Sequence, residues 1–247
     1  MITYRQGGDG MKLFESGRKQ ERRDKYSVFE RDIPAGTFNL IQGGIVVIGL
    51  VINWILLVLL QDSIADLNPI IFGFIYIAIW IAGIVLVSEV PNTFVVCVAY
   101  YMIVAPTGIL AASIIDLFSA KSGAEVVLQA VVAVTCVTAV VTCFAAIKPA
   151  VCDSLLTLAG IGSLGLVASI LIVSLSGWEV SVWAWLASVF ICFCFVYDMF
   201  HSQEFYKTVK NAVDCAVDIY LDTAFAIIKI PISLFGAYLE TFPWFWR

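Results

Sequence analysis

The sequence predicts an all-α integral membrane protein, a bundle of seven transmembrane helices. Of its 247 residues, 61% are hydrophobic and only 13% are charged, and the mean hydropathy is +0.97. Soluble domains carry about 25% charged residues, so we expect lipid to surround most of this chain. The charged residues form no basic face, and we therefore expect no nucleic acid as a partner.

The chain divides into a polar tail, residues 1–37, and a membrane domain, residues 38–247. Eight of the 14 Lys and Arg residues fall in the tail, which contains no apolar run of the kind found in signal peptides. We expect this tail to lie in the cytosol. Its basic stretch "GRKQERRDK" either touches anionic headgroups or is solvated and only sets the orientation.

Seven apolar runs in the membrane domain are long enough to be helices that span a bilayer. A span needs about 20 mainly apolar residues to cross a hydrocarbon core of about 30 Å. The connections between the runs contain Pro, Gly or charged residues, as in "SEVPN" and "SAKSGAE". The predicted spans lie near residues 38–60, 69–88, 93–117, 124–147, 153–175, 180–200 and 213–239.

Several polar and small residues within these runs predict helix packing. Asn39 and Asn53 in the first span are expected to hydrogen-bond to other helices. The glycines of "GGIVVIG" (43–49) in the first span and of "GIGSLG" (160–165) in the fifth span would let neighbouring backbones approach closely.

The distribution of basic residues predicts the orientation of the bundle. With the amino terminus inside, the cytosolic side holds the eight tail residues together with Lys148, Lys207 and Lys210, whereas the opposite side holds only Lys121 and Arg247. Lys and Arg accumulate on the cytosolic side of membrane proteins. An odd number of spans then places the carboxyl terminus on the opposite side of the membrane.

Two carboxylates lie within predicted spans rather than at their ends. Asp198, in "FVYDMF", is near the inner end of the sixth span, and Asp222, in "IYLDTAF", is about two turns inside the seventh. Residues 201–212 are expected to connect two antiparallel helices, and the midpoint between positions 198 and 222, position 210, falls within that connection. The spacing therefore allows the two carboxylates to face each other.

A facing pair of this kind would respond to pH. At about 4 Å and an effective dielectric constant near 20, two negative charges repel by about 4 kcal/mol, or about three pK units. Asp198 and Asp222 would then share one proton and titrate in two separate steps. We expect the pair to act as a pH-sensitive clasp between the two helices, which when fully ionised either pushes them apart or takes a cation.

Further charged residues extend this candidate site. Asp214, Asp218 and Asp222 are spaced four apart, which predicts an acidic stripe that could conduct cations from the cytosol. Lys229, seven residues further on, would be a tethered counter-ion. Asp214 and Asp218 can also be read as solvated residues of a first helical turn. Glu89 is either a solvated end of the second span or a member of an acidic cluster on the cytosolic side.

Spans one, six and seven resemble the Bax inhibitor motif family of seven-span membrane proteins, in its bacterial form. "AVDIYLD" is similar to the family's closing signature, the "YD" of "FVYDMF" stands 24 residues before Asp222 as the family's paired aspartate does, and "TFNLIQGGIVVIGLVIN" resembles the first span of bacterial members. In one respect the chain differs, because residues 69–88 contain no Arg or Lys where some members carry an Arg.

The resemblance implies a pH-sensitive calcium leak gated by Asp198 and Asp222, with no enzyme activity and no bound cofactor other than transported calcium. It also favours a prokaryotic plasma membrane as the location. Two alternatives remain open. The protein could be a non-conducting regulator that binds a membrane protease or stress component, or, more remotely, an intramembrane aspartyl protease, although its second aspartate lies in "YLD" rather than GxGD.

Overall fold

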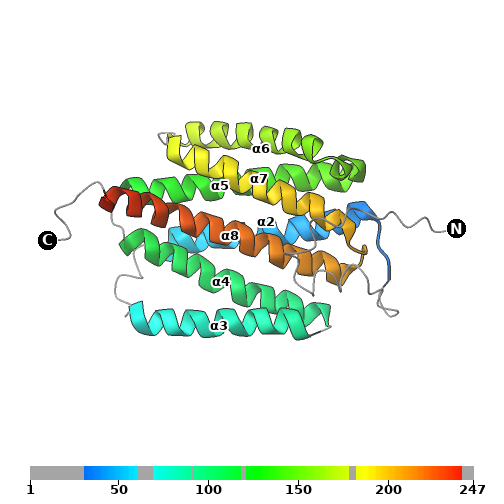
Figure 1. Ribbon diagram of the computed structural model, residues 1–247, viewed down its shortest axis with the longest axis horizontal. Helices are drawn as coiled ribbons and strands as arrows, with labels where there is room; N and C mark the ends of the chain where they lie inside the picture. Colours follow the sequence, from blue (N-terminus) through cyan, green and yellow to red (C-terminus); the bar gives the residue numbers. More distant parts are fainter. Residues whose placement is uncertain (1–30, 61–68, 91, 118–120, 178–181, 241–247) are drawn as a thin grey trace.

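The computed structural model describes residues 31–60, 69–90, 92–117, 121–177 and 182–240, with side chains in α8 described as far as Ala224. This part of the chain is all-helical, with seven α-helices and two short 3-10 helices (Figure 1). The α-helices are α2 (Ala35–Leu60), α3 (Pro69–Glu89), α4 (Thr93–Leu117), α5 (Lys121–Ile147), α6 (Leu155–Leu175), α7 (Val182–His201) and α8 (Val209–Glu240). The 3-10 helices are η2 (Pro149–Asp153) and η3 (Ser202–Glu204).

Each of the seven predicted spans corresponds to one α-helix. Among the described residues, four helices contain stretches that are long and apolar enough to cross a membrane, at Ala35–Leu59, Thr93–Leu110, Val127–Ile147 and Leu155–Leu175, and α3 holds a shorter apolar stretch, Phe74–Val87. The all-helical fold and its compatibility with a membrane are therefore confirmed. The number of membrane crossings and the orientation remain predictions.

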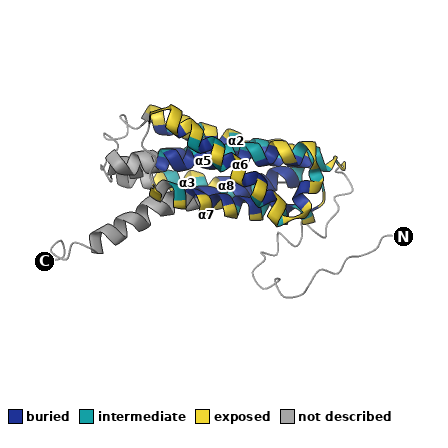
Figure 2. Cartoon of the chain, turned by 90° about the horizontal axis from the view of Figure 1, so that it is seen from above, coloured by how far each residue is buried: buried dark blue, intermediate teal, exposed yellow. Residues whose placement is uncertain are grey.

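α8 and α2 occupy the middle of the bundle. α8 packs against α2, α7 and α4, and α2 packs in addition against α5. Figure 1 shows α6 along one side of the bundle and α3 along the other, with α8 and α2 between them. Figure 2 shows that buried residues concentrate on the inner faces of the helices. Tyr100, Tyr220, Phe38 and Phe195 are among the largest side chains that are fully buried.

The outward faces of the peripheral helices are apolar. Phe74 on α3 is 72% exposed, and Leu156 and Leu175 on α6 are 84% and 88% exposed. Soluble monomers rarely expose large contiguous apolar surfaces. These faces are instead suited to contact with lipid chains, in agreement with the composition.

Some of the glycines allow the close packing that the sequence predicts. A Cβ atom on Gly43 would lie 1.9 Å from Oγ1 of Thr142, one on Gly49 would lie 2.1 Å from the Tyr100 hydroxyl oxygen, and one on Gly165 would lie 2.5 Å from Cα of Val137. Gly44 and Gly160, by contrast, have nothing within 4 Å of that position. The prediction is confirmed for the first three glycines and is wrong for the other two.

The residues around the α5–α6 and α7–α8 connections lie at one end of the bundle, together with residues 31–34 before α2 (Figure 1). We call this end the tail end, because the amino-terminal tail joins the bundle there. The predicted cytosolic orientation would place the tail end in the cytosol.

Candidate functional site

The hairpin of α7 and α8 carries the predicted acidic site, and its connection is shorter than expected. α7 ends at His201 and α8 begins at Val209, so residues 209–212 are helical and do not belong to the connection. Thr208 explains the early start, because its hydroxyl oxygen accepts a hydrogen bond from the Asn211 backbone N–H at 3.2 Å. A threonine that caps orphan N–H groups in this way is a common helix start signal.

Asp198 and Asp222 both lie within electrostatic range of the Cys194 thiol. Cys194 lies one turn before Asp198 on α7, and its thiol interacts electrostatically with both carboxylates. α7 and α8 also pack against each other. The Asp222 carboxylate on α8 therefore acts electrostatically on a side chain of α7. The direct pairing of the two carboxylates remains a prediction.

The two carboxylates differ in depth and exposure. Asp198 is three residues from the end of α7 and half-buried, whereas Asp222 is exposed and lies 13 residues after the start of α8. At 1.5 Å per residue, these positions are about 5 Å and about 20 Å from the ends of their helices. The prediction that Asp198 and Asp222 lie at equal depth assumed a connection over residues 201–212. Because α8 begins at Val209, that assumption does not hold.

The acidic stripe of α8 changes environment along the helix. Asp214 is buried with 5% of its surface exposed, Asp218 is half-buried and Asp222 is exposed. Each step of four residues rotates the side chain by about 40° around an α-helix. Two steps therefore turn the stripe from the interior toward the surface. Asp214 is not the solvated first-turn residue that one interpretation of the sequence suggested.

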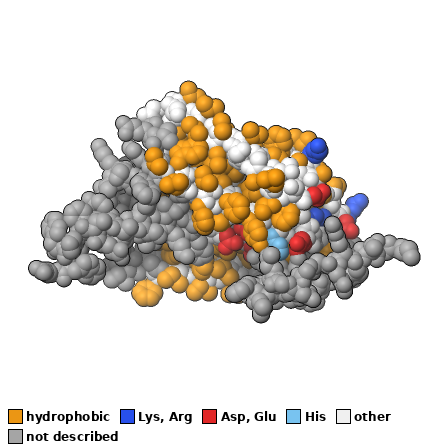
Figure 3. Space-filling model, turned by 45° about the horizontal axis from the view of Figure 1, so that its top comes forward, with side chains coloured by type: hydrophobic (Ala, Val, Ile, Leu, Met, Phe, Trp, Pro, Cys, Tyr) orange, Lys and Arg blue, Asp and Glu red, His pale blue; other side chains and the backbone are white. Residues whose placement is uncertain are grey.

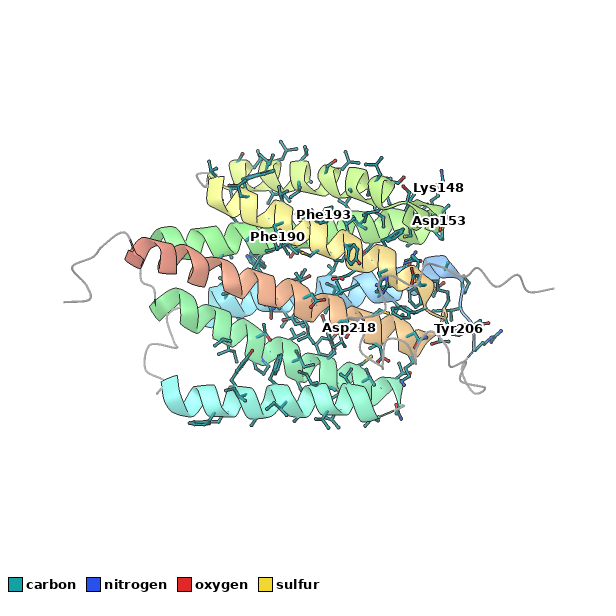
Figure 4. All side chains as sticks on the ribbon, viewed as in Figure 1. Lys148, Asp153, Phe190, Phe193, Tyr206 and Asp218 are labelled. Atoms are coloured by element: carbon teal, nitrogen blue, oxygen red, sulfur yellow. The ribbon has the colours of Figure 1, made fainter. Side chains whose placement is uncertain are left out.

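The surface around this stripe is mainly apolar. Figure 3 shows carboxylate atoms on a face that is otherwise largely hydrophobic and that also presents the histidine. Figure 4 places Asp218 on α8, and Phe190 and Phe193 on the neighbouring α7; these two phenylalanines are 64% and 55% exposed. The acidic groups therefore interrupt a surface that is otherwise suited to lipid.

The remaining predicted site residues lie outside the described side chains. Lys229 lies in α8 beyond Ala224, and Glu89 is the last residue of α3. α3 packs against α4, and α4 packs against α8, so α4 lies between Glu89 and the hairpin (Figure 1). Their roles as counter-ion and as a member of an acidic cluster stay predictions.

A neutral polar network lies on the inner side of α8. The Asn53 side-chain N–H group donates a hydrogen bond to the Tyr220 hydroxyl, and Tyr220 is also hydrogen-bonded to the side chain of Thr107. Thr107 is hydrogen-bonded in turn to Tyr76. This interior network links α2, α8, α4 and α3, and it confirms the prediction that Asn53 bonds to another helix. Sequence analysis missed Tyr220, although a tyrosine two residues from Asp222 must point to a different side of the helix.

A second network joins the helices at the tail end. Asn39 donates to the Ala145 carbonyl oxygen at 3.1 Å and to Sγ of Cys152 at 3.5 Å, and it accepts from Nε2 of Gln203 at 3.0 Å. The Ser202 hydroxyl donates to Oε1 of Gln42 at 3.1 Å. These bonds confirm the interhelical role predicted for Asn39, and they tie α2 to α5, η2 and the α7–α8 connection.

His201 ends α7 beside this network. Its Nδ1 atom lies 3.8 Å from a Glu204 carboxylate oxygen, and its ring stacks on Tyr197 and meets the edge of Phe205. The histidine is thus held in an aromatic setting at the tail end rather than fully solvated.

The acidic residues do not form a tight metal site within the part of the chain that the structure describes. No group of three or more His, Cys, Asp or Glu side chains there could hold a metal ion. Asp198 and Asp222 together offer at most four carboxylate oxygens, whereas calcium takes about six to eight oxygen ligands. Two carboxylates alone therefore supply too few oxygen ligands for tight calcium binding.

Comparisons of the chain with models of protein families, with curated proteins and with solved structures find no match.

Proposed function

We propose that this protein is a pH-sensitive cation leak of a membrane, with calcium as its cation and Asp198 and Asp222 as its gate. In this proposal all seven helices cross the bilayer of a prokaryotic cell, and the tail end lies in the cytosol. The observation that carries the proposal is that both carboxylates lie within electrostatic range of Cys194 on α7, which packs against α8, within an apolar surface.

The position of Asp222 supports a role that involves a proton or a cation. An ionised carboxylate placed about 20 Å along a membrane helix is costly in hydrocarbon. The cost falls if the side chain is protonated, hydrated or neutralised by a cation. Because Asp222 is exposed, its charge depends on the medium that borders this face of the bundle.

The arrangement suggests how pH would control the leak. When the pair holds one proton, a hydrogen bond between the carboxyl groups draws α7 and α8 together. When both groups ionise, repulsion separates the helices and favours a hydrated cation between them. Asp218, one turn from Asp222 and half-buried, would be the next acidic group on the path toward the tail end.

Calcium flux into liposomes tests this proposal. The full-length protein would be reconstituted with a calcium indicator inside, and flux would be measured between pH 6 and pH 8. We expect the Asp198→Asn and Asp222→Asn variants to lose most of the pH response. At the pH where the wild type is more active, their calcium flux should differ from that of the wild type by about tenfold. Asp153→Asn is the matched control, because Asp153 is exposed in η2, and it should retain the response. Unchanged flux and pH response in both site variants would contradict the proposal.

A second candidate function is a non-conducting regulator that binds another membrane protein. It is favoured by Gly44 and Gly160, since both glycines leave open space beside their helices where a partner helix could approach closely. Binding to a partner should then survive loss of both aspartates and should weaken in the Gly160→Leu variant. Flux that depends on the aspartates would instead favour the leak.

A further inference from the structure

One buried face of α2 carries polar side chains along most of its length. The residues on this face recur every three or four positions, and all are at most 7% exposed: Asn39, Gln42, Val46, Leu50 and Asn53. We call this set the inner face of α2. Three amides on one buried face are unusual in a helix that is apolar enough to cross a membrane, because each buried amide needs hydrogen-bond partners.

Only some of these amide groups have protein partners. Both ends of the Asn39 side chain are hydrogen-bonded to other segments. In contrast, Nε2 of Gln42 and Oδ1 of Asn53 have no hydrogen-bond partner among the residues that the structure describes. The opposite end of each amide is held, since Gln42 accepts from Ser202 and Asn53 donates to Tyr220. Each of these two amides is therefore fixed at one end and unpartnered at the other.

A group of unpartnered polar atoms lies between α2 and α5. Thr138 and Thr142 on α5 are 0% and 4% exposed, and neither hydroxyl has a hydrogen-bond partner within the described chain. Thr142 packs on Gly43, because a Cβ atom there would lie 1.9 Å from Oγ1 of the threonine. Gly43 is next to Gln42, and Thr138 is one turn from Thr142. The α2–α5 interface therefore brings three unpartnered polar groups into one region.

A second group of this kind lies between α2 and α8. Thr223 is 1% exposed, and its hydroxyl has no partner among the described side chains. It stands three residues after Tyr220, so both residues lie on the same side of α8. This is the side on which Tyr220 is hydrogen-bonded to Asn53. Oδ1 of Asn53 and the Thr223 hydroxyl therefore belong to the same interface.

We propose that the inner face of α2 holds two sites for internal water molecules, one at Gln42 between α2 and α5 and the other at Asn53 between α2 and α8. Buried polar groups are nearly always hydrogen-bonded, and internal water completes the bonds that protein groups leave open. A buried water makes about two to four hydrogen bonds. Each site offers it at least two polar atoms from facing helices.

The chemistry of the two sites selects water as the ligand. Gln42 contributes an N–H donor, which repels a cation, and the threonine hydroxyls can donate as well as accept. These groups are all neutral, whereas calcium takes about six to eight oxygen ligands, carboxylates among them. Helix packing alone would pair polar groups with each other, as it does for Asn39. It does not explain why atoms from facing helices lack partners in the same two places.

The two sites would bring water deep into the bundle. Gln42 and Asn53 are 7 and 18 residues after Ala35, the first residue of α2, which corresponds to about 10 Å and about 27 Å from the tail end. The deeper site is on the inner side of α8, whose outer side carries Asp222. The inference concerns the hydration of the interior and does not depend on the function proposed for the aspartates.

Radiolytic labelling detects internal water directly. Short X-ray pulses convert water, including buried water, to hydroxyl radicals that oxidise the nearest side chains, and mass spectrometry locates the products. Full-length protein in lipid nanodiscs would be compared at three side chains that are 0% exposed: Val46, one turn from Gln42; Leu50, one turn from Asn53; and Leu158 on α6. We expect Val46 and Leu50 to be labelled severalfold faster than Leu158. Equal labelling of all three would overturn the proposal.

Matched variants assign the labelling to each site. Thr142→Val and Thr223→Val both replace a hydroxyl with a methyl group of similar size. The first should slow the labelling of Val46 and not of Leu50, and the second should do the reverse. Thr135→Val is the control, because that hydroxyl donates to a carbonyl oxygen of its own helix at 2.7 Å, and it should change neither rate. Labelling that both site variants leave as in the wild type would contradict the proposal.

Thermal unfolding provides an independent test, which depends on the sign of the change. If a threonine hydroxyl binds water, valine removes that hydrogen bond, and the melting temperature of Thr142→Val and of Thr223→Val should fall by about 2–4 °C. If the hydroxyl is dry and unpartnered, valine removes the penalty of burying it, and the melting temperature should rise. A rise in one variant would exclude water at that site, and a rise in both would overturn the proposal.

Discussion

The inner and outer sides of α8 carry polar groups in opposite environments. On the inner side, Tyr220 is fully buried and is hydrogen-bonded to Asn53 and Thr107. On the outer side, Asp222 stands only two residues further along and is exposed. At this level α8 therefore buries a neutral group and leaves an acidic group at the surface, although nearer the tail end it buries the Asp214 carboxylate.

The difference shows how burial depends on charge and on hydrogen bonding. A neutral hydroxyl costs little to bury once its hydrogen bonds are made, whereas an ionised carboxylate costs far more. The inner network is therefore a structural device that fixes helices against one another. An acidic group on an apolar outer face contributes little to packing, and this favours a functional role for it.

The largest effect should follow from removing the inner tyrosine. Tyr220→Ala deletes a fully buried ring and leaves Asn53 without its acceptor, which should lower the free energy of unfolding by about 3–5 kcal/mol. Thermal unfolding in detergent micelles would measure the loss. Tyr206→Ala is the control, because Tyr206 is 39% exposed. Equal effects of the two substitutions would break the contrast between the inner and outer environments.

The pH dependence of stability should sharpen the comparison at the tail end, where a charged group is half-buried. Burial lowers the pKa of Lys207 from 10.5 to about 8, so the folded protein binds fewer protons than the unfolded chain between these values. The free energy of unfolding should therefore rise with pH across this window, by at most about 3 kcal/mol. Chemical unfolding at a series of pH values would show the rise in the wild type, and Lys207→Met should abolish it.

A smaller effect should separate the inner and outer faces of α2. Gly43→Ala would bring a Cβ atom to within 1.9 Å of the Thr142 side chain, and such overpacking costs about 1–3 kcal/mol. Gly44→Ala meets nothing within 4 Å and should be neutral or stabilising by up to about 1 kcal/mol, because alanine favours a helix more than glycine does. The melting temperatures of the two variants would rank them. The reverse order would show that α2 packs with a different face.

The smallest change in stability should come from the outer acidic residue. Asp222→Leu replaces an exposed carboxylate with an apolar side chain on an apolar face, and the free energy of unfolding should change by about 0.5 kcal/mol or less. The same variant should lose the pH response of calcium flux. A large loss of stability would show instead that Asp222 has a structural role like that of Tyr220.

The sequence alone determined the helices and some of their bonds. Long apolar runs predicted all seven α-helices, since the backbone groups of a lipid-embedded segment must hydrogen-bond within that segment. Asn39 and Asn53 were predicted to bond between helices, because an amide in an apolar run needs a partner. Thr208, whose hydroxyl caps α8, is also a signal in the sequence for the start of that helix. The predicted connection, residues 201–212, was nevertheless too long.

Only the tertiary structure decided which face of each helix is inside. The spacing of Asp214, Asp218 and Asp222 suggested one acidic stripe, yet the central position of α8 buries the first of them and exposes the last. In the same way, the sequence places Lys207 only on the cytosolic side of the bundle, whereas the fold brings its amine over the Phe38 ring. Local sequence sets the period and the apolarity of a helix, whereas the environment of a side chain depends on neighbours that are distant in the chain.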